Sequence, residues 1–378
     1  MIIEEYVMKK LGFGFMRLPV LDANDASKVD FDQLCKMVDT FMERGFTYFD
    51  TAYVYHKEQS EVFLKKAVVE RYPRDKFQVA TKLPMPKVNS VEDNEKLFNE
   101  ELEKCGVEYF DYYLLHAMNK ERFEKAKKYG SFEFLKKMKA EGKIKHIGFS
   151  FHQDVALLEE MLTVWPETEF VQLQINYIDW LNPTIQAKEC YELCTKLGKP
   201  VIVMEPIKGG SLVNIPQEAQ DVLKAYNPDA SLASWAVRYA ASLDNVMMVL
   251  SGMSNMDHVE DNTSYMENFV PLNEDEYKAI EKVVDIINSS IAIPCTTCGY
   301  CVDGCPAGIP IPKYFALYNA DLQSLNKGFS PQQTYYTNMV VTLPRANRCI
   351  GCGQCENACP QHLEIIEGLK LVSERFDK

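Results

Sequence analysis

The chain has 378 residues, with 41 basic and 54 acidic side chains and a formal net charge of −13 at pH 7. This acidity, without a long basic run, argues against nucleic acid or an anionic membrane as a partner. No run of about 18 apolar residues is present to cross a membrane. The first residues carry acids where a secretory signal has an apolar segment, so we expect a cytoplasmic protein.

The first 270 residues alternate short apolar runs with amphipathic segments. The apolar runs are typical of buried strands, and they cover residues 12–18, 48–52, 77–83, 111–116, 146–150, 170–176, 201–206 and 246–252. The segments between them have the apolar spacing of helices. Eight strand-then-helix units predict a closed (β/α)8 TIM barrel, which usually takes about 250 residues. An open doubly wound sheet is the alternative, but no G-x-G-x-x-G motif follows the first run.

Residues 271–290 predict a further helix, which begins with a capping box formed by Asn273 and Glu276 and closes the barrel. We place the domain boundary after it, with the barrel in residues 1–288 and a smaller domain in residues 289–378. No low-complexity linker lies between them, so we expect the two domains to pack together.

Four ionisable residues stand near the ends of consecutive predicted strands: Asp50, Tyr55, Lys82 and His116. Strand ends of a TIM barrel meet at one face, where active sites lie. Each residue alone has an ordinary alternative, such as a cap, an aromatic plug, a solvated lysine or a core histidine. Together they can move a proton: an ammonium held by a carboxylate lowers the pKa of a tyrosine from about 10. That tyrosine can protonate a carbonyl oxygen, which a neutral histidine orients.

The motifs FDTAYVY, ATKLP, DYYLLH, IGFSFH and VQLQINY resemble those of the aldo-keto reductase family, in order and spacing, over roughly residues 10–265. The resemblance implies hydride transfer between NAD or NADP and a small aldehyde, ketone or alcohol. It assigns Tyr55 as general acid/base, Lys82 as the group that lowers its pKa, Asp50 as the anchor of Lys82, and His116 as the residue that orients the carbonyl.

The resemblance also implies where the dinucleotide would lie. Ser150 and Gln172 would bind the nicotinamide carboxamide, and Met204 would pack under the ring, where family members often have Tyr. Family members often have Asn at the position of Phe151. The whole implied set is Gly14, Met16, Arg17, Ser150, Gln172, Met204, Ser254, His258 and Asn262.

The preference for NADH or NADPH stays open at this point. Members of the family that prefer NADPH place Lys or Arg around the 2′-phosphate. The matching positions here hold Gly252, Met253, Ser254 and His258. These residues offer a dianionic phosphate a hydroxyl, backbone amides and an imidazole, but no permanent cation.

Eight of the twelve cysteines follow residue 290 and form two runs with the spacing C-x-x-C-x-x-C-x-x-x-C-P. This spacing resembles that of bacterial two-cluster ferredoxins, in which the fourth cysteine ligates the other cluster. The expected sets for two [4Fe–4S] clusters are Cys295, Cys298, Cys301 and Cys359, and Cys349, Cys352, Cys355 and Cys305. Zinc is the alternative for paired cysteines, but two complete runs of four favour iron–sulfur clusters. The helix predicted at residues 311–323 favours a helical ferredoxin variant over the minimal βαβ form.

Two roles for the clusters are compatible with the sequence: structural support, or electron transfer with a redox partner such as a flavoprotein or a ferredoxin. Nicotinamide gives up two electrons as hydride, whereas a cubane accepts one, and a flavin normally converts between the two. A second class of function is a non-catalytic NAD(P)-binding sensor whose clusters report oxygen or redox state. The four ionisable residues at the strand ends favour an enzyme.

Overall fold

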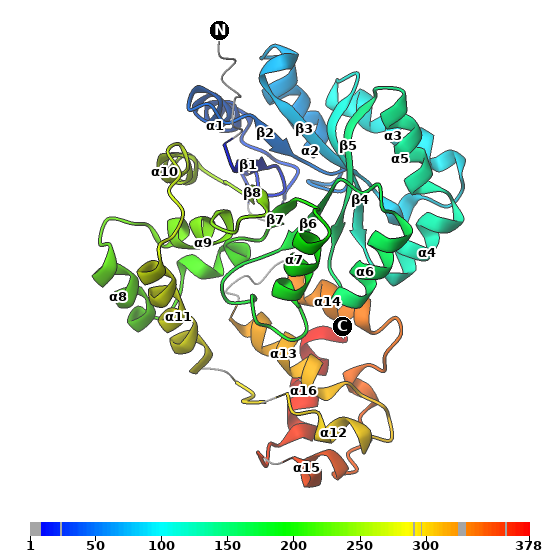
Figure 1. Cartoon of the computed structure of the whole chain (residues 1–378), viewed down its shortest axis with the longest axis vertical. Helices are drawn as coiled ribbons and strands as arrows, with labels where there is room; N and C mark the ends of the chain where they lie inside the picture. The colour runs from blue at the N-terminus through cyan, green and yellow to red at the C-terminus, as the bar shows by residue number, and fades with distance from the viewer. Residues whose placement is uncertain (1–8, 23–24, 290–291, 296, 324–329, 360) are drawn as a thin grey trace.

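The structure is a computed structural model, and it describes residues 9–22, 25–289, 292–295, 297–323, 330–359 and 361–378. Eight parallel strands close into a barrel in sequence order, and β8 pairs with β1 (Figure 1). The strands are β1 (Leu11–Gly14), β2 (Tyr48–Asp50), β3 (Gln78–Leu83), β4 (Phe110–Met118), β5 (Ile144–Phe151), β6 (Phe170–Gln174), β7 (Val201–Met204) and β8 (Val246–Ser251). The predicted TIM barrel is confirmed.

Helices surround the barrel. They are α1 (Phe31–Glu43), α2 (Ser60–Leu64), α3 (Glu92–Cys105), α4 (Lys120–Lys128), α5 (Ser131–Ala140), α6 (Val155–Val164), α7 (Ala187–Lys196), α8 (Gln217–Tyr226), α9 (Leu232–Ala241), α10 (Met256–Met266) and α11 (Glu274–Ser289). The apolar pattern did not predict α4 and α8. In α4 the reason is its composition, since only Phe123 and Ala126 of its nine residues are buried.

The barrel interior holds its own apolar cluster, separate from the layer between strands and helices. Its buried members are Tyr48, Ala80, Tyr112, Leu114, Phe170, Ile202, Met248 and Leu250. Side chains along a strand alternate between the two faces of a sheet. The residues two positions further along therefore also face inward, at the carboxyl ends of the strands: Asp50, Lys82, His116, Gln172 and Met204.

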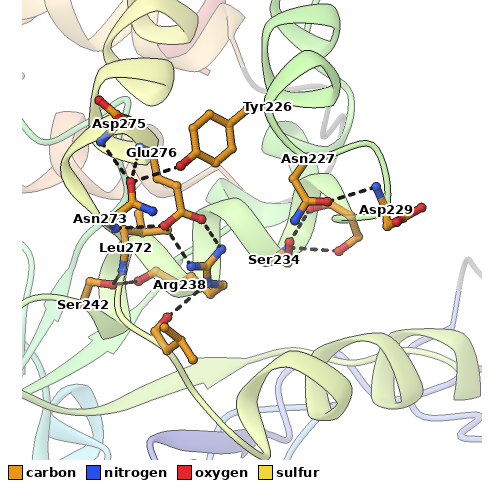
Figure 2. A network of polar contacts seen from close by, with 12 residues as sticks. Tyr226, Asn227, Asp229, Ser234, Arg238, Ser242, Leu272, Asn273, Asp275 and Glu276 are labelled. Carbon is orange, nitrogen blue, oxygen red and sulfur yellow. Dashed lines mark hydrogen bonds and ion pairs between the residues drawn. The ribbon is translucent and has the colours of Figure 1, made fainter.

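The predicted capping box at the start of α11 is present (Figure 2). The Asn273 side chain accepts from the backbone N–H of Glu276 at 3.0 Å, and the Glu276 carboxylate accepts from the backbone N–H of Asn273 at 2.9 Å. Arg238 of α9 donates to both oxygens of Glu276, at 2.8 and 3.2 Å. Because the cap is thus bound to α9, α11 is fixed against the barrel wall.

The part after α11 is helical. It contains α12 (Tyr300–Asp303), α13 (Ile311–Leu322), α14 (Pro331–Met339), α15 (Gln354–Ala358) and α16 (Ile365–Phe376). No strand occurs among its described residues, as expected for a helical ferredoxin variant. Its apolar core is continuous with the outer layer of the barrel, so the two parts pack together. Figure 1 shows α13 and α14 beside the barrel, and α12 and α15 at the far end of the molecule.

None of the helices in the described ranges combines the length and the apolarity needed to cross a membrane.

Candidate active site and cysteine centres

The buried ion pair of Lys82 and Asp50 lies at the carboxyl ends of β3 and β2. The Lys82 ammonium donates to both Asp50 oxygens, at 2.7 and 2.8 Å, and to the carbonyl oxygen of Thr51, at 2.7 Å. Lys82 is fully buried and Asp50 is 3% exposed. Since all three donor positions of the ammonium are used and its partner is rigidly placed by the sheet, Lys82 has a fixed position.

Tyr55 lies between Lys82 and His116. The Lys82 ammonium is 5.4 Å from the centre of the Tyr55 ring, and the His116 ring lies edge-on to it with the two centres 5.9 Å apart. Tyr55 and His116 are both only partly buried, so a small molecule can reach them. The structure therefore brings all four predicted catalytic residues together.

The expected lowering of the pKa of Tyr55 is not found. Burial raises its pKa, the carboxylates of Asp50 and Glu205 raise it further, and the Arg17 guanidinium opposes them. The physical reason is the pairing of Lys82: an ammonium neutralised by Asp50 has little charge left to stabilise a phenolate. Part of the ring remains in contact with solvent, which screens these charges. Tyr55 is thus a phenol, not a phenolate, at neutral pH.

His116 is neutral at the same pH. Burial lowers the pKa of its imidazole well below the ordinary value of 6.5, and the charges of Lys82, Arg122 and His152 act in the same direction. The expectation of a neutral histidine agrees with this direction.

Ser150 and Gln172 lie side by side on β5 and β6, where their backbones are directly paired. The Ser150 hydroxyl oxygen accepts from the backbone N–H of Ala117 at 2.7 Å, so its proton is free to be donated. Gln172 donates to the Met204 sulfur at 3.5 Å, and its carbonyl oxygen is buried without a hydrogen-bond partner among the described residues. One donor and one acceptor next to each other match the two ends of a carboxamide.

Residues after β1 continue this surface. Gly14 is paired with Asp50, and Met16 and Arg17 lie in the turn that follows. An Arg17 nitrogen is 3.9 Å from a Glu205 oxygen. One Arg17 nitrogen and one Glu205 oxygen are buried without hydrogen-bond partners in the part of the chain that the structure describes.

The segment after β8 is held by its own contacts. The Ser254 hydroxyl donates to the carbonyl oxygen of Arg17 at 3.0 Å, and the Ser254 N–H donates to the His258 ring at 3.2 Å. Asn262 is buried; it donates to Ser251 at 2.8 Å and accepts from the Tyr265 hydroxyl at 2.6 Å. Ser254 and His258 are therefore close together, while much of the Asn262 amide is already engaged inside the protein.

The eight cysteines of the two runs surround two hollows. Cys295, Cys298, Cys301 and Cys359 line one hollow, and Cys305, Cys349, Cys352 and Cys355 line the other. The fourth cysteine of each run thus lies with the first three of the other run. Ile311, at the start of α13, lines both hollows.

The cysteine groups fit a cubane better than a single zinc ion. A zinc ion with bonds of about 2.3 Å gathers its four sulfurs to within about 4 Å of one another. No three His, Cys, Asp or Glu side chains of the described ranges converge in that way on one point; the cysteines are spread around the hollows. Gly299 and Gly353, each directly after the second cysteine of its run, have φ values of 82° and 74°, which let the chain turn tightly into α12 and α15.

Comparison with known families agrees with this geometry. The model of the aldo/keto reductase family matches residues 10–285. The chain belongs to this family. A model of a 4Fe-4S dicluster domain matches residues 294–364, which include all eight cysteines of the two runs. The protein is thus an oxidoreductase of the aldo/keto reductase family with a C-terminal iron–sulfur domain.

Relatives of this aldo/keto reductase match its barrel. An uncharacterized oxidoreductase of Schizosaccharomyces pombe is 26% identical over 268 residues, 69% of this chain and 82% of that protein. Glyoxal reductase of Bacillus subtilis is 24% identical over 203 residues, 53% of this chain and 65% of that protein.

Solved structures show the same fold. An aldo-keto reductase of Bacillus halodurans in its holo form has a TM-score of 0.57 at 24% identity, covering 72% of this chain and 91% of that one. An aldo-keto reductase of Klebsiella pneumoniae in complex with NADPH has a TM-score of 0.59 at 17% identity, covering 73% and 91%.

The sequence did not point to a second buried ion pair at the same face of this aldo/keto reductase. Lys208, just after β7, donates to Asp179 at 2.6 Å, and both side chains are buried. Asp179 also accepts from Gln174 and Asn176, each at 2.9 Å. A lysine close behind a strand end, as at Lys82, was the available signal, but its partner lies 29 residues away in a loop without a recognisable pattern.

Proposed function

We propose that this protein reduces small aldehydes or ketones with NADH or NADPH, and catalyses the reverse oxidation of alcohols. The observation that carries the proposal is the position of Tyr55 between His116 and a lysine that is held by a carboxylate. When bound, the dinucleotide supplies a hydride to the carbonyl carbon. The residues of the chain must then deliver one proton to the carbonyl oxygen.

Tyr55 is suited to deliver that proton, because the raised pKa keeps its hydroxyl protonated at neutral pH. The ring of the phenolate that remains has the Lys82 ammonium 5.4 Å from its centre, where Asp50 keeps that ammonium in place. His116, being neutral, can donate one N–H to the same carbonyl oxygen and fix its direction. The same groups run in reverse for an alcohol, and then Tyr55 must first lose its proton, which its raised pKa disfavours.

The nine predicted cofactor residues remain our proposal for dinucleotide binding. Support comes from Ser150, with a proton to donate, beside Gln172, with an unpartnered buried oxygen. These two can bind the carbonyl and the amine of the carboxamide. Near the 2′ position Ser254 and His258 offer a hydroxyl and a ring. The NADPH complex of the Klebsiella relative makes NADPH a reasonable first cofactor to test, with NADH beside it.

For the second domain we propose the crosswise cluster ligation and the boundary between residues 288 and 289. Support for a structural role of the clusters comes from α12 and α15, which have four and five residues and are too short to be stable alone. A relay would exchange electrons with a flavoprotein or ferredoxin where Cys298 and Cys352 are exposed. Thiolate ligation of this kind fits the cytoplasm, our proposed location.

The test is anaerobic turnover of a set of aldehydes and ketones with NADH and with NADPH. We expect oxidation of at least one dinucleotide that depends on the carbonyl compound. Tight dinucleotide binding without turnover of any compound would contradict the proposal and favour the non-catalytic sensor. For the clusters, the test is Cys352→Ala. If the clusters are structural, the variant should have a lower thermal stability and a little-changed kcat per folded molecule. If its stability is unchanged but it no longer accepts electrons from a reduced dye, the relay is favoured instead.

A further inference from the structure

Helix α14 of the iron–sulfur domain contacts the loops that follow the catalytic strands (Figure 1). The Asn338 side chain accepts from Asn119 at 2.8 Å and donates to the carbonyl oxygen of His152 at 3.2 Å. Asn119 directly follows β4, which carries His116, and His152 directly follows β5, which carries Ser150. The Tyr335 ring lies edge-on to the His152 ring, with centres 5.8 Å apart. This helix therefore lies at the face where the chemistry takes place.

The helix has two functionally different faces. Tyr336 faces its own domain, where it packs against Tyr314 and Phe376. Tyr335 and Asn338 are three residues apart and share another face, and both contact the barrel. Gln332 lies one turn before both Tyr335 and Tyr336, between these two faces.

Gln332 is completely buried, and both polar atoms of its amide lack a partner among the described residues. Nδ1 of His152, whose ring contacts Tyr335, is in the same situation. An unpartnered buried polar atom costs about 1–3 kcal/mol, and native proteins rarely keep several together. A polar ligand at this place would satisfy them.

The charge of that ligand is indicated by Arg122 in α4. Its guanidinium donates to the carbonyl oxygen of Ala117, the residue after His116, at 2.6 Å. Other cations at this face have carboxylate partners, namely Lys82, Lys208 and Arg17. No ion pair of Arg122 occurs within the described ranges, and the carboxylate that acts on its charge is that of its neighbour in the sequence, Glu121. Its charge also lowers the pKa of both His116 and His152, which places it close to the two rings.

We propose that α14 forms the outer wall of the substrate pocket, and that Arg122 binds a carboxylate carried by the carbonyl substrate. A guanidinium pairs with a carboxylate through two parallel hydrogen bonds, which fixes orientation as well as charge. Gln332 and Asn338 add amide groups from the iron–sulfur domain. The inference rests on the proposed carbonyl reduction and names its substrate class.

The first experiment compares 4-carboxybenzaldehyde with methyl 4-formylbenzoate, which is similar in size but has no charge. In the wild type we expect the acid to have the lower KM. Arg122→Gln should raise KM for the acid about 10- to 100-fold, the value of a charge-assisted hydrogen bond, and leave the ester unchanged. Arg122→Lys should recover part of the effect. Lys128→Gln, at the exposed end of the same helix, is the control for a lost positive charge.

The second experiment tests whether α14 forms the outer wall of the substrate pocket. Gln332→Met keeps the size of the side chain and removes its amide; it should raise KM for the acid without loss of iron. If Gln332 were only a packing residue, the same variant would gain stability, since two unpartnered buried atoms are removed, and KM would not change. Asn338→Ala should raise KM for both aldehydes, while Thr337→Ala, exposed on the same helix, should not.

The outcomes separate the two proposals. If neither aldehyde nor any other carbonyl compound is reduced, the proposed function itself is wrong. If both are reduced with equal kcat/KM, and Arg122→Gln affects them equally, carbonyl reduction stands and the carboxylate site is overturned. If KM is unaffected by Gln332→Met and Asn338→Ala, the helix does not contribute to the pocket.

Discussion

The barrel and the iron–sulfur domain position their reactive groups in different ways. In the barrel, Asp50 and Lys82 extend from strands of a closed sheet whose interior is filled with large side chains, so the packed core fixes them. In the second domain the cysteines lie on loops and on helices of four and five residues. Helices this short are not stable by themselves and so cannot hold the cysteine side chains in place. The site in the barrel is therefore formed by folding itself, whereas under a structural role of the clusters the second site would become stable only when its cysteines bind them.

The largest expected effect tests whether barrel chemistry is independent of the clusters. Tyr55→Phe removes the proton donor and should lower kcat about 10²- to 10⁴-fold, while iron content and cluster absorption remain as in the wild type. Tyr53→Phe is the matched control, because the Tyr53 hydroxyl donates to Glu100 at 3.2 Å and does not face the carbonyl site. A comparable loss in both variants would contradict the role of Tyr55.

The next effect measures how far the stability and the activity of the barrel depend on the buried ion pair of Lys82 and Asp50. Lys82→Met leaves Asp50 buried without its partner and should lower the free energy of unfolding by about 3–5 kcal/mol. The double variant Lys82→Met/Asp50→Asn should recover most of that stability but none of the activity. Denaturant unfolding under anaerobic conditions gives the first quantity, and turnover gives the second. Recovery of activity in the double variant would show that Lys82 serves stability alone.

The barrel and the convergence of the four candidate residues could be predicted because both follow from repeated local rules. Alternation along parallel strands places Asp50, Lys82 and His116 at one face as soon as the barrel is recognised. The arrangement of the cysteines around two hollows was expected from the resemblance of the two runs to those of two-cluster ferredoxins.

What the sequence did not contain were properties that depend on packing between distant segments. The pKa of Tyr55 rises because burial and the carboxylates of Asp50 and Glu205 outweigh the Arg17 guanidinium, and no spacing rule gives that balance. Helix α14 meets the loop after β5 through Asn338 and His152, which are 186 residues apart. Only the folded chain shows that the second domain borders the candidate active site.

A smaller effect concerns the pH dependence of stability, through His152 at the border between the two domains. Burial lowers the pKa of His152 to about 4, and the charge of Arg122 contributes. In the unfolded chain the histidine takes up a proton near pH 6.5, so stability is fully present above that pH and falls below it, until pH 4. Between pH 7.5 and 5.5 the loss is at most about 1.3 kcal/mol, because residual solvent access weakens the shift.

His152→Phe should remove that part of the acid sensitivity, as measured by urea unfolding at the two pH values. Other buried groups contribute in the same pH range. His116, whose pKa is lowered, acts in the same direction, whereas Glu61, whose pKa burial raises to about 7, acts in the opposite direction. An unchanged difference between pH 7.5 and 5.5 in the variant would mean that His152 is solvated enough to titrate normally.

The smallest expected effect, a change of about twofold in iron content, shows which cysteines ligate each cluster of the second domain. If each cluster takes its fourth ligand from the other run, Cys359→Ala removes a ligand from the group of Cys295, Cys298 and Cys301. It should then lose about half of the iron and sulfide and match Cys298→Ala in its spectrum. If ligation stays within each run, it should match Cys352→Ala instead. Cys35→Ala, in α1, is the control.

The same variants test the contrast between the two domains. Since Ile311 lines both cysteine groups and begins the helix that joins them, crosswise ligation makes the two clusters one structural unit. Loss of either should therefore loosen α13 and α14 together, and KM for the carbonyl substrate should rise while kcat at saturation changes little. A barrel that kept its KM after losing a cluster would be a complete enzyme by itself, with the iron–sulfur domain as an independent neighbour.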